Sequence, residues 1–279
     1  MRKLINANFY RLRKSKLFWL LGFICFAFGA FSYTLVAVNT KNLGQGWLNY
    51  NAHTYFYLPI MFLPAVIAVF SDFFIGADYS DGTIRNKLAV GHSMSNVYMS
   101  YLITSSAVMI FFAAAYLLAV LIIGLPFCGT AVLTQVKLQW RVFNLLLIFI
   151  EYVCIFVLMA MLDSNKARNV VISLLLVLFI TLIGMMLYSR YSQPEFVSRV
   201  VSLPDGGIEL REGEPNSKYI TGPVRTVYQW ALFIVPHGSA MLSLDKNMVF
   251  DWRIPVMSVV LIAVFTVGGM QLLKKKDIK

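Results

Sequence analysis

LFWLLGFICFAFGAFSYTLVAV, residues Leu17–Val38, is a run of 22 residues without a charged side chain. An α-helix needs about 20 consecutive apolar residues to cross the hydrocarbon core of a bilayer. The run is also longer than the apolar segment of a secretory signal peptide, which has about 7–15 residues, and no small-residue cleavage site follows it promptly. The stretch therefore predicts a first membrane span that is retained.

Five further stretches have a similar length and composition: Thr54–Gly76, Asn96–Ile123, Trp140–Leu162, Asn169–Tyr188 and Ile254–Leu273. Of the 279 residues, 59% are hydrophobic and only 13% are charged, whereas a soluble domain is about 25% charged. Lipid is the simplest way to cover so much apolar side chain. The sequence therefore predicts an all-α integral membrane protein with six transmembrane helices in a single domain, residues 1–279.

The Lys and Arg residues are concentrated on one side of the predicted spans. Fourteen of them lie in the N-terminal segment, in the loops after the second and fourth spans, and in the C-terminal tail. The loops after the first and third spans hold three. Short loops that are rich in Lys and Arg stay in the cytoplasm. We therefore expect a multi-pass protein of the cell membrane with both termini cytoplasmic, and we attribute the net charge of +11 to membrane topology rather than to nucleic-acid binding.

Residues 189–253 form the long hydrophilic interruption of the pattern. The part Ser192–Gly222 carries acidic residues and turn signals such as Pro204-Asp205-Gly206-Gly207, and it predicts an extracellular loop or small cap between spans five and six. Val227–Leu242 is apolar but short, and Pro236, His237 and Gly238 interrupt it. It predicts a re-entrant or interfacial piece rather than a span. A seventh span here would move the C-terminus to the other side.

Residues 1–16 combine six basic residues with apolar ones. Ile5, Phe9 and Leu12 fall on one helical face at i, i+4 and i+7 spacing. A basic amphipathic helix of this kind lies in the membrane interface. We expect an N-terminal interfacial helix before the first span, with a plain basic tail as the alternative.

The chain lacks the motifs of the common catalytic and nucleotide sites. It has no G-x-x-x-x-G-K-[ST], no H-E-x-x-H and no G-x-S-x-G, and its three cysteines share no metal-ligand spacing. The histidines His53, His92 and His237 are scattered over different loops. We therefore expect no catalytic residues and no metal site, and a membrane-embedded enzyme is disfavoured.

The loop between the second and third spans, residues 77–95, is the most informative polar stretch. It reads DYSDGTIRNKLAVGHS from Asp78 to Ser93. Asp81-Gly82-Thr83 predicts a turn with N-cap chemistry, and Ile84, Lys87 and Leu88 predict a short amphipathic helix that ends at Gly91. Such a helix across the inner mouth of a bundle could receive a push from a soluble partner, although an ordinary cytoplasmic loop has the same composition.

The order of a basic amphipathic helix, two spans and an acidic-x-x-x-Gly-Thr loop resembles the ABC type-2 transporter permease family. It is similar to the permeases of bacitracin-, lantibiotic- and peptide-toxin-type exporters. That family commonly has Glu-x-x-x-Gly-Thr after the second span, and this chain has Asp78 in the acidic place, followed by Gly82-Thr83-Ile84. It departs from the pattern at Met94 and Tyr101, where Arg and Lys are frequent.

The resemblance implies the transport subunit of an exporter, not an enzyme. Two permease chains, here expected to form a homodimer, would each engage one of two copies of a separate ATPase that binds the ATP and Mg²⁺, so this chain would hold no cofactor. The exported substrate would be a hydrophobic or amphipathic peptide or antimicrobial compound. The loop would be a coupling helix docked in the ATPase, with these residues in the contact: Asp78, Asp81, Gly82, Thr83, Ile84, Arg85, Asn86 and Lys87.

Two roles are expected inside that loop. Asp78 would cap the helix or pair with basic residues of the N-terminal segment. Arg85 and Lys87 would meet acidic groups on the ATPase.

Glu151 lies near the middle of the fourth predicted span. An ionisable residue at that depth costs at least a few kcal/mol, so it should face protein or a watery cavity. It is a candidate for the substrate pathway, as a contact for substrate or proton, and the alternative is a structural hydrogen bond to a neighbouring helix. The rival functions for the whole chain are a secondary transporter or channel, and a membrane immunity or sensor subunit.

Overall fold

The computed structural model describes residues 1–43, 58–124, 126, 138–202, 208–245 and 251–275. Six of its helices are long and apolar enough to cross a membrane, which confirms the predicted all-α membrane protein and its span count. They are α2 (Lys16–Leu43), α4 (Pro59–Ser80), α6 (Met94–Ala119), α8 (Leu138–Leu162), α9 (Lys166–Tyr191) and α12 (Arg253–Lys274). A π-helical turn, η1 (Val120–Gly124), continues α6.

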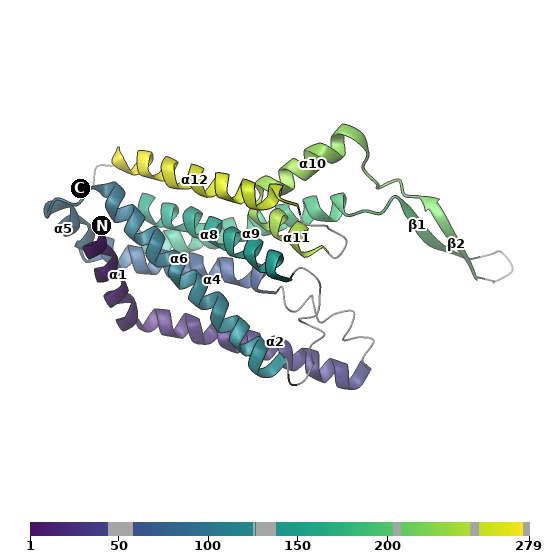
Figure 1. Ribbon diagram of the computed structural model, residues 1–279, viewed down its shortest axis with the longest axis horizontal. Helices are drawn as coiled ribbons and strands as arrows, with labels where there is room; N and C mark the ends of the chain where they lie inside the picture. Colours follow the sequence, from purple (N-terminus) through teal and green to yellow (C-terminus); the bar gives the residue numbers. More distant parts are fainter. Residues whose placement is uncertain (44–57, 125, 127–137, 203–207, 246–250, 276–279) are drawn as a thin grey trace.

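Helices α4 and α8 form the centre of the bundle, and about two thirds of each apolar stretch is buried. Helix α4 packs against α6, α8 and α9, while α12 packs on α8 and α2 packs on α6. The N-terminus, the C-terminal end of α12 and the short helix α5 (Thr83–Ala89) lie at one end of the bundle (Figure 1). We call this the terminal end, and we call the opposite end the hairpin end.

The second span begins later in the structure than the apolar run predicted. Helix α4 starts at Pro59, where the missing N–H of proline costs no helical hydrogen bond. Pro59 therefore begins the helix, whereas Pro64 lies inside it. The part Thr54–Tyr57 of the predicted span lies outside the described residues.

The hydrophilic segment after α9, predicted as an extracellular loop or small cap, contains a β-hairpin. Strands β1 (Phe196–Ser202) and β2 (Ile208–Pro215) pair antiparallel and project away from the bundle (Figure 1). The run Ile208-Glu209-Leu210-Arg211 alternates apolar and polar residues, which is the period-2 signal of a strand. That signal is only four residues long, which explains why the segment was predicted as a loop.

The short apolar piece Val227–Leu242 becomes two helices and no span. These are α10 (Gly222–Ile234) and α11 (Pro236–Leu244), and the extended residue Val235 separates them. A residue that precedes proline is pushed out of the helical region, so Pro236 accounts for the break. The even span count therefore holds.

Helix α11 is buried against α8 and α9. A Cβ atom on Gly184 of α9 would lie 2.8 Å from the backbone nitrogen of Gly238 and 2.8 Å from the Cβ of His237. The two helices can approach this closely because residue 184 has no side chain. This contact fixes α11 on the bundle at the hairpin end.

Candidate functional site

The predicted short helix after the second span exists as α5, and it lies at the terminal end (Figure 1). Its N-cap is Gly82, in the left-handed region with φ 66°, and no side chain caps it. The predicted turn at Asp81-Gly82-Thr83 is therefore present, but neither Asp81 nor Thr83 caps the helix with its side chain. The chain turns sharply through the glycine instead, and the backbone N–H of Gly82 donates to the carbonyl of Tyr79 at 3.2 Å.

Helix α5 ends as its sequence predicts. Gly91 has φ 93°, its N–H donates to the carbonyl of Leu88, and the N–H of His92 donates to the carbonyl of Lys87. These two bonds form a Schellman motif, for which glycine at the left-handed position is the usual residue. Glycines therefore define both ends of α5.

The two faces of α5 differ in burial. Ile84 is buried in the bundle core and Lys87 is half-buried. The opposite face is exposed, and it presents Arg85, Asn86 and Val90, with Val90 80% exposed. The helix thus has an anchoring face and a free face.

Asp78, near the end of α4, is the centre of a buried polar cluster. Its carboxylate forms an ion pair with Arg11 of α1 (Arg2–Lys14) and accepts a hydrogen bond from the hydroxyl of Tyr101 of α6. The Nζ atom of Lys87 lies 2.9 Å from the second carboxylate oxygen. Of the two roles expected for Asp78, the structure shows the pair with the basic N-terminal helix.

Lys87 is used inside the protein. Besides Asp78, its ammonium donates to the hydroxyl of Tyr101 at 3.0 Å and to the side-chain oxygen of Asn8 at 3.3 Å, and only 12% of its side chain is exposed. The prediction that Lys87 meets acidic groups of an ATPase therefore does not fit this geometry, whereas Arg85 is exposed. Burial and the nearby Arg11 guanidinium lower the pKa of Lys87 to about 8.

Helix α1 packs on α6 through a face that shares only Leu12 with the predicted apolar face. Leu4, Asn8 and Leu12 are buried, while Ile5 and Phe9 are half-buried. The apolar pattern missed this face because a polar residue is at its centre. The side-chain amide of Asn8 donates to Ser100 Oγ at 3.2 Å.

Arg11 also holds α1 to the body of α4. Its guanidinium donates to the backbone carbonyl of Phe74 at 2.9 Å and lies 3.8 Å from the centroid of the Phe74 ring. We use the name junction for Asn8, Arg11, Asp78, Lys87 and Tyr101, which join α1, α4, α5 and α6. No periodic pattern marks Tyr101 or Asn8, since both are isolated positions whose partners lie far away along the chain.

Glu151 of α8 is 1% exposed, and neither of its carboxylate oxygens has a hydrogen bond within the described structure. The polar group that faces it is the hydroxyl of Ser258 on α12. Two residues along a helix correspond to a rotation of about 200°, so Glu151 lies on the opposite side of α8 from Phe149.

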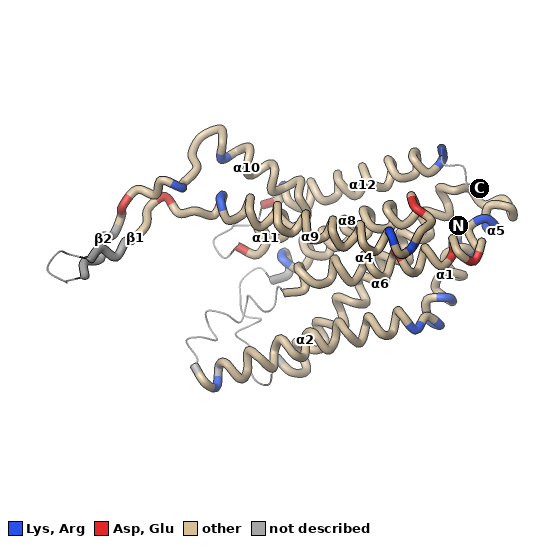
Figure 2. Tube along the Cα trace, turned by 180° about the vertical axis from the view of Figure 1, so that it is seen from behind, with Lys and Arg blue, Asp and Glu red and all other residues tan. Residues whose placement is uncertain are grey.

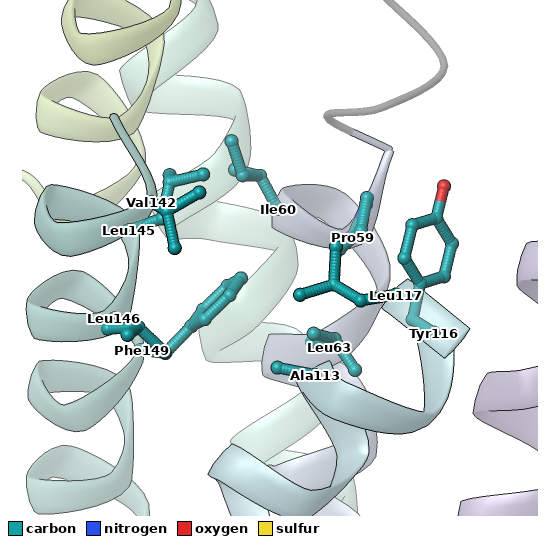
Figure 3. Close-up of a pocket in the computed structure, with 10 residues that line it drawn as sticks. All are labelled: Pro59, Ile60, Leu63, Ala113, Tyr116, Leu117, Val142, Leu145, Leu146 and Phe149. Carbon is teal, nitrogen blue, oxygen red and sulfur yellow. The ribbon is translucent and has the colours of Figure 1, made fainter. Parts of the chain in front are cut away.

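Phe149 lines an apolar cavity of about 50 Å³ that α4, α6 and α8 enclose near the hairpin end (Figure 3). Its walls include Ile60, Leu63 and Leu145, and the Phe149 ring lies between α8 and the other two helices (Figure 3). For comparison, an apolar cavity of about 150 Å³ binds benzene. This cavity therefore accommodates only a small alkyl group, and Glu151 does not line it.

A second buried carboxylate, Asp72, was not among the predicted site residues. It lies on α4 with 0% exposure, and Ser173 of α9 is the polar group that faces it. Its oxygens have no hydrogen bond in the described part of the chain. No group of three potential metal ligands exists among the described residues.

The comparisons with known proteins agree with the geometry. No curated protein matches the chain. The model of a family described as ABC-2 family transporter protein matches residues 4–184. These residues include most of α1 and α9, all of α2, α4, α5, α6 and α8, and every residue of the junction. The chain therefore belongs to the ABC-2 transporter family, as its sequence resemblance predicted.

Proposed function

We propose that this chain is the permease of an ATP-driven exporter and that the exposed face of α5 receives the movement of a separate ATPase. Membership of the family makes the chain a membrane transport subunit that associates with an ABC ATPase. The coupling role of α5, the exporter direction and the substrate are the further steps of the proposal.

One observation supports the coupling role most strongly. The free face of α5 carries Arg85, Asn86 and Val90, while its other face is tied to the membrane helices through Ile84 and the Lys87–Asp78 pair. A push on α5 would be passed to α4 through Asp78, to α6 through Tyr101 and to α1 through Arg11. Coupling in a packed protein travels through such contiguous contacts.

The charges support a cytoplasmic position for the terminal end. Figure 2 shows basic residues of α1, of α5, and of the C-terminal end of α12 at this end of the molecule. Since Lys and Arg near span ends favour the cytoplasm, both termini and α5 would face the ATPase there.

The remaining parts of the proposal follow the family. A homodimer of this chain, with two ATPase copies that bind ATP and Mg²⁺, would move a hydrophobic or amphipathic peptide or antimicrobial compound out of the cell. ATP can drive this only if the affinity for substrate differs between the two states of the pathway. The apolar cavity is too small for such a substrate, which favours a pathway between the two permease chains, and Glu151 remains a candidate contact for substrate or proton.

The first test is whether a P-loop ATPase co-purifies with the chain and whether its ATP hydrolysis responds to this subunit. The second is Gly82→Pro. Proline cannot adopt φ 66° and has no N–H to donate to Tyr79, so α5 should lose its orientation and transport should become uncoupled from ATP hydrolysis. Gly222→Pro, at φ 61° near the hairpin end, is the matched control.

We expect Gly82→Pro to remain in the membrane and to lose transport, while Gly222→Pro keeps the coupling ratio of the wild type. An absent ATPase partner, or hydrolysis that is indifferent to the subunit, would contradict the exporter. Normal transport by Gly82→Pro would remove the coupling role of α5 alone.

A further inference from the structure

A pocket of about 340 Å³ lies at the terminal end, beside the junction. It is found where α1 ends and α2 begins, against the side of α4. Ser15, with ψ 116°, is the single residue that breaks the helix there. Neither the coupling proposal nor the family match assigns a role to this pocket.

The walls of the pocket are chemically divided. Arg11, Lys14 and Ser15 form its polar side. Leu17 and Phe73 form part of its apolar side, and the Phe73 ring is 41% exposed. A ligand that fits both sides must carry a polar head that prefers cations and an apolar part that prefers lipid.

The head must be an anion. The sequence holds no Asp or Glu before Asp72, and no acidic residue lines the described pocket. Arg13 and Lys16, next to it, are exposed and add positive charge. The ammonium of Lys14 lies 4.4 Å from the ring centroid of Tyr10.

The carboxylates of Asp78 and Asp81 both interact with Arg11, and Asp78 also pairs with Lys87. Of the two cations that line the pocket, Arg11 is therefore already paired. Lys14 forms no ion pair among the described contacts, so it is the lining cation with charge to offer a ligand.

The pocket also lies at the depth of lipid headgroups. Trp19, one turn into α2, is 56% exposed and donates from its indole nitrogen to the carbonyl of Arg13 at 3.0 Å. Exposed tryptophan with a satisfied polar edge marks the membrane interface. Tyr10 on α1 is 64% exposed, and it supports the same depth.

We propose that this pocket binds an anionic phospholipid. Its phosphate lies between Arg11 and Lys14, and the start of one acyl chain lies on Leu17 and Phe73. Basic pockets between membrane helices are suited to anionic headgroups. Arg11 also pairs with Asp78, so the bound lipid contacts the junction directly. The charge of its headgroup therefore acts on the residues through which, in the coupling proposal, a movement of α5 reaches the membrane helices.

The test uses the full chain purified in detergent and measures bound lipid by native mass spectrometry. The probes are phosphatidylglycerol and phosphatidylcholine with identical acyl chains, and inorganic phosphate. Lys14→Gln removes the charge at the pocket, and Lys3→Gln removes the same charge from an exposed position of α1 away from it. The measurement requires no ATPase, so it can fail independently of the exporter proposal.

Wild-type protein should retain phosphatidylglycerol in preference to phosphatidylcholine. Lys14→Gln should weaken that retention about fivefold, since one cation near a membrane surface contributes about 1 kcal/mol, and Lys3→Gln should leave it unchanged. Equal retention of the two lipids, or equal losses in the two variants, would overturn the proposal. Displacement of the lipid by millimolar inorganic phosphate would also overturn it, because the ligand would then be the free anion.

Discussion

The two ends of the bundle are held together by different forces. At the terminal end, buried charges join helices that are far apart in the sequence, as Arg11, Asp78 and Lys87 do. At the hairpin end, α11 is placed by the close approach of Gly184 to Gly238, and Asp245 accepts hydrogen bonds from Arg141 at its backbone carbonyl and from Tyr188 at its carboxylate. The first end is built to transmit a movement between elements, and the second to hold its elements in place.

The largest expected effect comes from removing the charge at the centre of the junction. Asp78→Asn leaves Arg11 and Lys87 without their common carboxylate, and breaking a buried pair in this way costs about 3–5 kcal/mol. The free energy of unfolding, measured in mixed detergent micelles, should fall by that amount. Asp81→Asn, at an exposed position on the same turn, should change it by less than about 0.5 kcal/mol. Equal effects of the two variants would show that the junction is not an energetic centre.

A smaller effect is expected at the hairpin end. Gly184→Val would place its Cβ 2.8 Å from the backbone of Gly238, so α11 must move, at a cost of about 1–3 kcal/mol. Gly268→Val on α12 meets nothing within 4 Å and is the control. Because the hairpin end holds its elements in place, Gly184→Val should lower the free energy of unfolding but keep the wild-type ratio of transport to ATP hydrolysis. Both quantities are measured in one preparation. Loss of coupling at wild-type stability would contradict the division between the two ends.

The smallest effect on stability is expected from Glu151→Gln, which keeps the shape and the hydrogen-bonding capacity toward Ser258. The free energy of unfolding should change by less than about 1.5 kcal/mol, the scale of one net hydrogen bond. If Glu151 contacts substrate or proton, transport should fall without a matching loss of stability. Unchanged transport and unchanged stability would remove the functional role of Glu151.

The features that could be predicted from sequence are those carried by long or local patterns. Six apolar runs were sufficient to predict six spans, because a bilayer imposes one length on every helix that crosses it. The end of α5 at Gly91 was predictable for the same kind of reason, since a left-handed C-terminal residue is encoded by one glycine.

The features that were missed depend on partners that are distant in the sequence or on signals that are too short. Asn8 is a polar residue outside the predicted apolar face, yet it donates to Ser100, which lies 92 residues away in the sequence. Tyr101 looked like a departure from the family pattern, yet its hydroxyl contacts Asp78 across α4 and α6. Lys87 was assigned to an outside partner because the direction of a side chain on a helix of one or two turns cannot be read from composition.

The most direct test of the central claim is to ask which surface of the chain touches the ATPase. An ultraviolet-activated cross-linking amino acid in place of Arg85, on the free face of α5, should form a covalent adduct with the ATPase subunit. The same amino acid in place of exposed Ser217, near the hairpin, should form none. An adduct from position 217, or none from position 85 in a complex that hydrolyses ATP, would contradict the account.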